Sequence, residues 1–219
     1  MENLDTVFRL NCRPDIDNMM DSNHDLFTSG YENKIDMFEL NIKRSIHIKN
    51  EVSIQDKNVK SMSDIFGNIN MIQVDLLSIV YYMFYEKRIL PKIYLSRQSA
   101  LLIYESLNDF DAIRGKVRKI LNEHIANSDD NRFYIELIDR TEIFKNKILQ
   151  FKNKNFDYLK EIRMNIIGHR DPDFGKQIEV MSQSDPYAIL GISMYFDEII
   201  QSFNDILYDY LTKHIKFED

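Results

Sequence analysis

The 219-residue sequence has few of the residues that break or cross-link a chain. It contains six glycines, four prolines, one cysteine and no tryptophan. A many-stranded β fold needs frequent turns, so the shortage of Gly and Pro argues against one. The single Cys12 excludes an intrachain disulfide and a cysteine-based zinc site, and it fits a reducing compartment best.

Targeting and membrane signals are also lacking. The first residues do not combine a basic region with an apolar stretch, so we expect no signal peptide. The longest strongly apolar run, Leu76 to Tyr85, covers about ten residues, whereas a membrane span needs about twenty. The sequence therefore predicts a cytoplasmic protein without a membrane partner.

The composition is 44% hydrophobic and 29% charged, which is typical of a globular protein. The net charge of −7 argues against a general nucleic-acid coat. The charge is uneven, because nine basic and five acidic residues lie between Arg140 and Lys176. This segment is either a solvated helix face or a local patch for a phosphate backbone.

Apolar residues recur at helical spacing through most of the chain, which predicts an all-α helical bundle. We place the bundle domain at residues 61–219 and an N-terminal extension at residues 1–60. The extension is expected to be irregular to about residue 30 and helical from about residue 32. Residues 45–60 fit either a short strand or a frayed helix.

Start and stop signals divide the bundle. One helix is expected from about Ser63 until Pro91 stops it, and Gly168 is expected to end a later one. Between them, apolar residues at helical spacing predict helical segments at 95–107, 113–124, 131–151 and 156–167. The helix of 131–151 either continues through residues 153–155 into the last segment or kinks there. Ser184 or Asp185 followed by Pro186 starts a long amphipathic C-terminal helix of about thirty residues.

Arg163 is the most informative charged residue. At about 100° per residue it falls inside the apolar stripe of its helix. A guanidinium keeps its charge, so it needs a carboxylate, backbone carbonyls or an incoming phosphate as a partner. Asn165 and His169 follow on neighbouring surface. A histidine titrates near neutrality and an arginine can stabilise a phosphorane, so this pair suffices for RNA cleavage without a metal. A buried or interfacial salt bridge of Arg163 is the structural alternative.

The stretch from Tyr158 to Asp171, which reads YLKEIRMNIIGHRD, resembles the signature of the HEPN superfamily. That signature is an arginine, usually followed by a polar residue, with a histidine a few positions later. Here five residues separate Arg163 from His169. The chain departs from the pattern at Met164, where the family usually has Asn or Asp, and its asparagine stands one position later.

The resemblance implies a helical bundle that forms a homodimer and brings two motifs together. It implies a metal-independent endoribonuclease of a toxin–antitoxin or phage-defence system, with an antitoxin or another protein as a further partner. Arg163 and His169 are then catalytic, assisted by Asn165, and no cofactor is needed. The expected RNA-binding cations of the basic segment are Lys154, Lys160, Arg170 and Lys176.

Other members of the superfamily are inactive, so a non-catalytic module that binds protein or nucleotide is the alternative function. A metal site at His169, Asp171 and Asp173 is a third reading, but Arg170 and Pro172 interrupt the usual loop spacing. We therefore expect no metal. The aromatic run at 81–85 could stack bases, although a core position accounts for it better.

Overall fold

The computed structural model describes residues 14–51, 56–127, 131–167 and 185–215, except for the side chains of residue 14 and of residues 165–167. These ranges hold six helices and no strand, so the predicted all-α class is confirmed. The helices are α2 (Pro14–Ser22), α3 (His24–Asn50), α4 (Lys57–Tyr85), α5 (Ile89–Asn127), α6 (Arg132–Ile167) and α8 (Pro186–His214).

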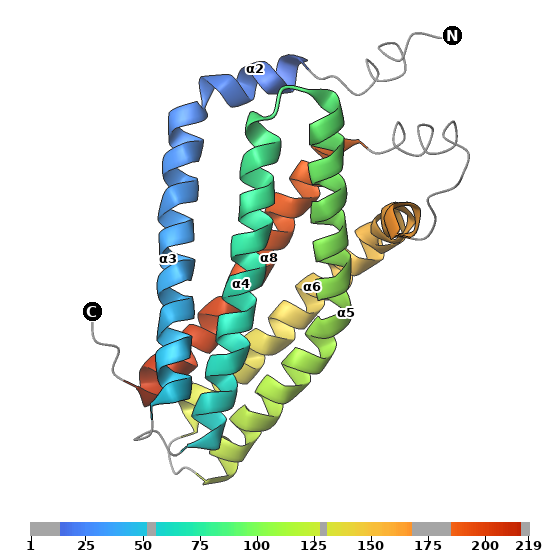
Figure 1. Cartoon of the computed structure of the whole chain (residues 1–219). Helices are drawn as coiled ribbons and strands as arrows, with labels where there is room; N and C mark the ends of the chain where they lie inside the picture. The colour runs from blue at the N-terminus through green and yellow to red at the C-terminus, as the bar shows by residue number, and fades with distance from the viewer. Residues whose placement is uncertain (1–13, 52–55, 128–130, 168–184, 216–219) are drawn as a thin grey trace.

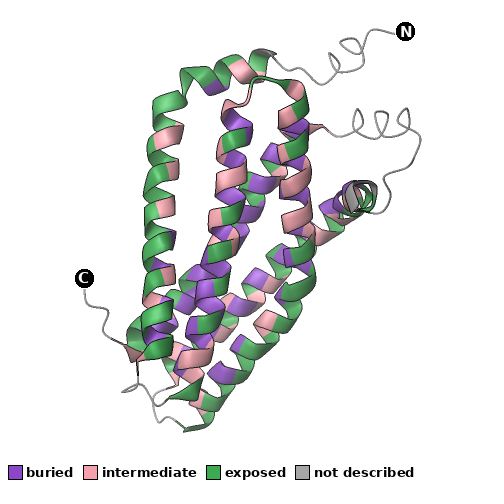
Figure 2. Cartoon of the chain, viewed as in Figure 1, coloured by how far each residue is buried: buried purple, intermediate pink, exposed green. Residues whose placement is uncertain are grey.

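The C-terminal helix α8 is central to the bundle. It packs against α4, α5 and α6, while α3 lies along α4 and the short α2 crosses one end (Figure 1). Buried positions accordingly concentrate on α8 and on the inner faces of α4, α5 and α6 (Figure 2). The apolar stripe of α8 is thus largely used inside the chain.

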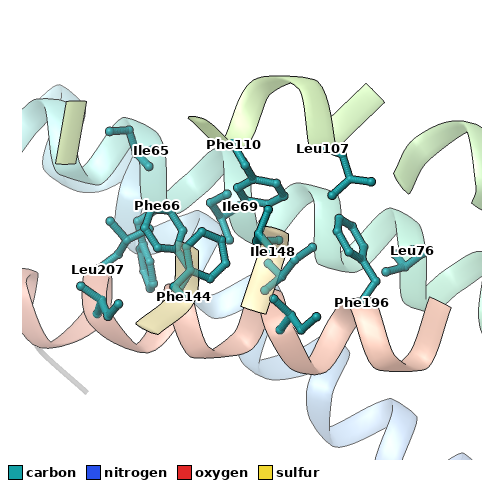
Figure 3. Close-up of a cluster of buried hydrophobic side chains, with 14 of the residues drawn as sticks. Ile65, Phe66, Ile69, Leu76, Leu107, Phe110, Phe144, Ile148, Phe196 and Leu207 are labelled. Carbon is teal, nitrogen blue, oxygen red and sulfur yellow. The ribbon is translucent and has the colours of Figure 1, made fainter. Parts of the chain in front are cut away.

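Phenylalanines from four helices form the middle of the core (Figure 3). Phe110 of α5 meets Phe144 of α6 edge to face at 5.5 Å between ring centroids. Phe144 in turn stacks on Phe203 of α8 at 4.5 Å. All three rings are almost fully buried. Burial of each ring contributes about 2–3 kcal/mol, so this contact fixes how α5, α6 and α8 meet.

The predicted signals at the start of α8 are confirmed. The Asp185 carboxylate accepts hydrogen bonds from the backbone N–H groups of Tyr187 and Ala188, and Pro186 occupies the first helical turn. Asp56 caps α4 in the same way, by accepting from Asn58 and Val59. Such side-chain caps satisfy N–H groups that have no partner within the helix.

The predicted limits of α4 were wrong at both ends. The helix begins at Lys57 instead of Ser63, and it ends at Tyr85 instead of continuing to Pro91. Pro91 lies in the first turn of α5. A proline is tolerated there because the first N–H groups of a helix need no carbonyl partner.

The prediction of irregular structure to about residue 30 is wrong for residues 14–30. Residues 14–22 form α2 and the following ones belong to α3. Tertiary packing compensates for the polar sequence, because Phe27 stacks on Phe84 of α4 at 3.8 Å and Phe38 is fully buried. Of the two readings of residues 45–60, the helical one holds through Asn50, and α4 starts at Lys57. Residues 52–55 lie outside the described ranges.

Helices α5 and α6 are longer than the segments predicted for them. The expected segments 95–107 and 113–124 are one helix, and α6 runs through residues 153–155 without a break. The last turns of α6 are nevertheless seen almost end-on in Figure 1, so the helix changes direction along its length. The buried Asn155 donates from Nδ2 to the carbonyl of Phe151 at 3.0 Å, a local bond of the kind that accompanies helix bends. Gly168, the predicted stop, lies outside the described residues.

Three buried asparagines join α3, α4 and α8. Asn70 and Asn204 exchange hydrogen bonds of 2.9 and 3.1 Å through their side-chain amides, and Asn41 donates to Asn70 at 3.0 Å. Asn70 also donates to the carbonyl of Phe66 at 2.7 Å. This asparagine cluster ties α3 to the bundle although α3 was expected to belong to an extension.

None of the described helices has an apolar stretch long enough to cross a membrane.

Candidate functional site

Arg163 lies near the C-terminal end of α6 and faces α5. Its Nε donates to Oε1 of Glu105 at 2.7 Å, and this hydrogen bond, together with the charge of Glu105, raises the pKa of Arg163 above its ordinary value. The two side chains are 35% and 50% exposed. The expectation that Arg163 needs a partner is met by a carboxylate of the same chain, at the edge of the apolar stripe.

Two aromatic rings lie beside this ion pair. The guanidinium carbon of Arg163 stands 5.2 Å from the ring centroid of Tyr104, and Tyr104 stacks on Phe156 at 5.0 Å. The ammonium of Lys152 lies 5.1 Å from the ring centroid of Phe156. Each of the two stacked rings therefore has a cation beside it at the contact between α5 and α6. Such cation–ring contacts hold a charged group in a defined place.

Within the described part of the chain, the outer edge of the guanidinium has no hydrogen-bond partner. Among the described residues, no hydrogen bond involves Nη1 or Nη2 of Arg163, since its contact with Glu105 uses Nε alone. An arginine has five N–H donors, of which four are on these two atoms. Arg163 can therefore keep its ion pair with Glu105 and still offer a two-pronged contact to a phosphate.

The other predicted site residues are described only in part. Asn165 lies in the last turn of α6, but its side chain is outside the description, as are His169, Arg170 and Lys176 altogether. Likewise, the alternative metal ligands His169, Asp171 and Asp173 lie outside it. Across the described ranges, no three His, Cys, Asp or Glu side chains are grouped as a metal site requires.

The predicted RNA-binding lysines of α6 are both exposed but do not share a face. Lys160 is within one turn of Arg163, about 60° around the helix. Lys154 stands nine residues before Arg163 and projects from about the opposite side. Lys152, which the sequence analysis did not single out, lies close to the Arg163 direction. Its spacing of eleven residues from Arg163, three helical turns, is the signal that identifies it.

The basic segment is only partly neutralised. Arg140 pairs with Asp209 of α8 at 2.6 Å, and Lys145 pairs with Glu142 at 3.3 Å. In contrast, no carboxylate within the described part of the chain pairs with four lysines of α6, namely Lys147, Lys152, Lys154 and Lys160. Of these four, Lys160 and Lys152 lie on the side of α6 near Arg163, so positive charge without a carboxylate partner among the described residues is present there.

A groove between α4 and α5 begins beside Glu105. One hollow of about 520 Å³ is lined by Glu105, Asp75 and an apolar floor, and the next, of about 510 Å³, shares Tyr82 and Leu95 with it. Tyr82 is exposed, whereas Met83 and Phe84 of the same aromatic run are buried. The core position is therefore confirmed for Met83 and Phe84, whereas Tyr82 lies outside the core.

A second cluster of titratable groups joins the C-terminal ends of α5 and α8 to the start of α6. The Nε2 of His124 and the hydroxyl of Tyr210 lie 2.7 Å apart, and the hydroxyl of Tyr134 and Nε2 of His214 lie 3.2 Å apart. The two imidazoles are 4.8 Å from each other. Burial, and then the neighbouring His124, lower the pKa of His214, while burial raises the pKa of Tyr210.

Comparisons with models of protein families, with curated proteins and with solved structures find no match to this chain.

Proposed function

We propose that this protein is a metal-independent endoribonuclease similar to those of the HEPN superfamily, acting in a toxin–antitoxin or phage-defence system. The observation that supports this best is the state of Arg163. Its guanidinium is half-exposed, held through Nε, and open at Nη1 and Nη2 among the described residues. That is the arrangement a phosphate-binding arginine needs, six positions before the only histidine in the motif.

The proposed reaction uses the RNA's own 2′-hydroxyl. His169 takes the proton from this hydroxyl as its oxygen attacks the adjacent phosphorus, and the bond from phosphorus to the 5′-oxygen breaks. The products are a 2′,3′-cyclic phosphate and a 5′-hydroxyl, whose proton comes from a protonated imidazole or water. Arg163 stabilises the negative charge on phosphorus in the transition state. Asn165 assists, and Lys160, Arg170 and Lys176 hold neighbouring phosphates, whereas Lys154 projects from the opposite side of α6 and is not part of the proposed site.

The active form is proposed to be a homodimer in which two copies of the motif meet. The sequence left the interface open between α8 and the motif helix α6. Because the apolar stripe of α8 packs inside the chain, we favour α6. Met164, next to Arg163, is 54% exposed there. An exposed methionine beside the motif is a suitable contact for a second copy.

The experiment is cleavage of a mixed-sequence RNA by purified protein in the presence of EDTA, with the ends of the products mapped. Arg163→Ala and His169→Ala should abolish cleavage. Arg140→Ala is the matched control, because Arg140 is on the same helix, is 32% exposed and also pairs with one carboxylate. Cleavage that persists in the Arg163 and His169 variants, or that occurs only with added metal, would refute the proposal.

The alternative is a non-catalytic helical module that binds a protein or a nucleotide. The ion pair between Arg163 and Glu105 favours it, since a guanidinium whose charge is balanced by a carboxylate of its own chain needs no phosphate for that purpose. In that case the wild type and Arg163→Ala leave the RNA equally intact in EDTA.

A further inference from the structure

We infer that Glu105 of α5 is a positioning residue for Arg163, which extends the site from the motif helix to a second helix. This inference rests on the proposed function. Glu105 lies 58 positions before Arg163 in the sequence and outside the motif, yet its Oε1 accepts the hydrogen bond from Nε of Arg163 at 2.7 Å.

The choice of atom determines what the ion pair can do. A carboxylate that bound Nη1 and Nη2 would occupy the edge that a phosphate uses. Glu105 instead takes Nε, the donor nearest the helix, and leaves the outer edge open among the described residues. The pair therefore orients the guanidinium without blocking it.

Tyr104 limits the rotation of the guanidinium that the hydrogen bond with Glu105 leaves free. A hydrogen bond at Nε limits the swing of the side chain, but the guanidinium can still turn about that bond. The ring of Tyr104, 5.2 Å from the guanidinium carbon, provides a surface on which the guanidinium rests. Tyr104 is itself supported by stacking on Phe156. Adjacent residues of α5 thus hold Arg163 in one arrangement before RNA arrives.

The charge of Glu105 predicts where its effect appears in the kinetics. A carboxylate beside the site repels the phosphates of bound RNA, so it does not favour ground-state binding. A fixed guanidinium, in contrast, acts on the charge that develops at phosphorus in the transition state. Glu105 is therefore expected to raise kcat and to leave KM unchanged or slightly raised.

Two substitutions separate positioning from a structural role. Glu105→Gln keeps an oxygen that can accept from Nε, whereas Glu105→Ala removes the acceptor. We expect kcat to fall about tenfold in the Gln variant and about a hundredfold in the Ala variant, with KM equal to or below that of the wild type. The melting temperature should change little in both, because exposed ion pairs contribute little to stability.

The matched control is Asp209→Asn. Asp209 is 42% exposed and accepts from Arg140 of the same helix α6 at 2.6 Å, so it tests the loss of an ion pair away from the motif. Its kcat should stay at the wild-type value. As a direct readout, the Nε–H signal of Arg163 in an NMR spectrum, assigned by its loss in Arg163→Lys, should exchange slowly with water in the wild type. In Glu105→Ala it should exchange fast.

The outcomes distinguish this inference from the proposed function. If wild-type RNA cleavage depends on Arg163 but both Glu105 variants retain kcat within twofold, the positioning role is refuted and the function stands. A drop in kcat that merely follows a lower melting temperature, with an unchanged Nε–H signal, also refutes it. If the wild type is as inactive as Arg163→Ala in EDTA, the function fails and the inference fails with it.

Discussion

The buried asparagine cluster allows a stability prediction that can be worked out from its contacts. Replacing Asn70 by alanine removes the partner of Nδ2 of Asn41 and of both Nδ2 and Oδ1 of Asn204. Three buried polar groups then lack a partner, at about 1–3 kcal/mol each, while the better helix propensity of alanine returns about 0.5 kcal/mol. We expect Asn70→Ala to lower the free energy of unfolding by about 3 kcal/mol or more.

The assay is urea unfolding followed by circular dichroism at the helical minimum. Asn68→Ala is the matched control, because Asn68 is an exposed asparagine two residues away on the same helix, and its loss should change stability by no more than about 0.5 kcal/mol. Asn41→Ala should fall between the two, since it breaks one bond of the cluster. If Asn70→Ala unfolds within about 1 kcal/mol of Asn68→Ala, the cluster does not contribute as argued.

Two further predictions concern pH and assembly. The pKa of His214 is lowered in the folded state, so below about pH 6.5 the unfolded state binds more protons than the folded state. As the pH falls below this value, the free energy of unfolding should decrease by up to about 1.4 kcal/mol per pH unit, until the pH passes the pKa of folded His214. Unfolding between pH 5 and 7 should show this slope, and His214→Gln should reduce it whereas the exposed His47→Gln should not. Met164→Glu should shift a homodimer toward monomer in light scattering, and the 53% exposed Met71→Glu on α4 should not; equal masses for both variants would argue against an interface on α6.

The sequence determined α8 best and residues 14–30 worst, for a physical reason. Every signal for α8 is local: Asp185 caps it, Pro186 starts it, and its apolar residues recur at helical spacing. Residues 14–30, which form α2 and the start of α3, have no such local signals, although helical spacing correctly predicted α3 from about residue 32. Their sequence is polar, and the contacts that stabilise them, such as Phe27 on Phe84, join residues far apart in the chain. Periodicity detects a continuous apolar face. It does not detect helical turns that are held by a few isolated contacts with a neighbouring helix.

Pro91 illustrates a limit of a different kind. A proline is disfavoured in the interior of a helix, but it is tolerated both after the end of one helix and within the first turn of the next. Its position alone therefore does not show which of the two it marks. The break lies before it, at residues 86–88, where Glu86 accepts from the backbone N–H and the side chain of Arg88. The hydrogen bonds from Arg88 lower the pKa of Glu86 to about 2, so this carboxylate stays charged across the physiological range.

The asparagine cluster was accessible to sequence reasoning in part. Asn70 is four residues after Phe66 and seven before Leu77, so it belongs to the stripe that α4 buries. A polar residue at such a position predicts a buried hydrogen bond, because an unpaired amide there is costly. The partner, Asn204, lies 134 positions away and follows only from the packing of α8 on α4.

For the candidate site, too, the sequence predicted that a side chain needs a partner but not which residue the partner is. The position of Arg163 on its helix established that the guanidinium needs a negative or carbonyl partner, and it set an internal carboxylate against an incoming phosphate as alternatives. With Glu105 on Nε alone, the two are compatible, since one guanidinium has enough donors for both. The ion pair by itself therefore does not decide between a structural and a catalytic arginine. What decides is the consequence of losing Glu105: a structural pair affects only stability, whereas a positioned catalytic arginine loses turnover while RNA still binds.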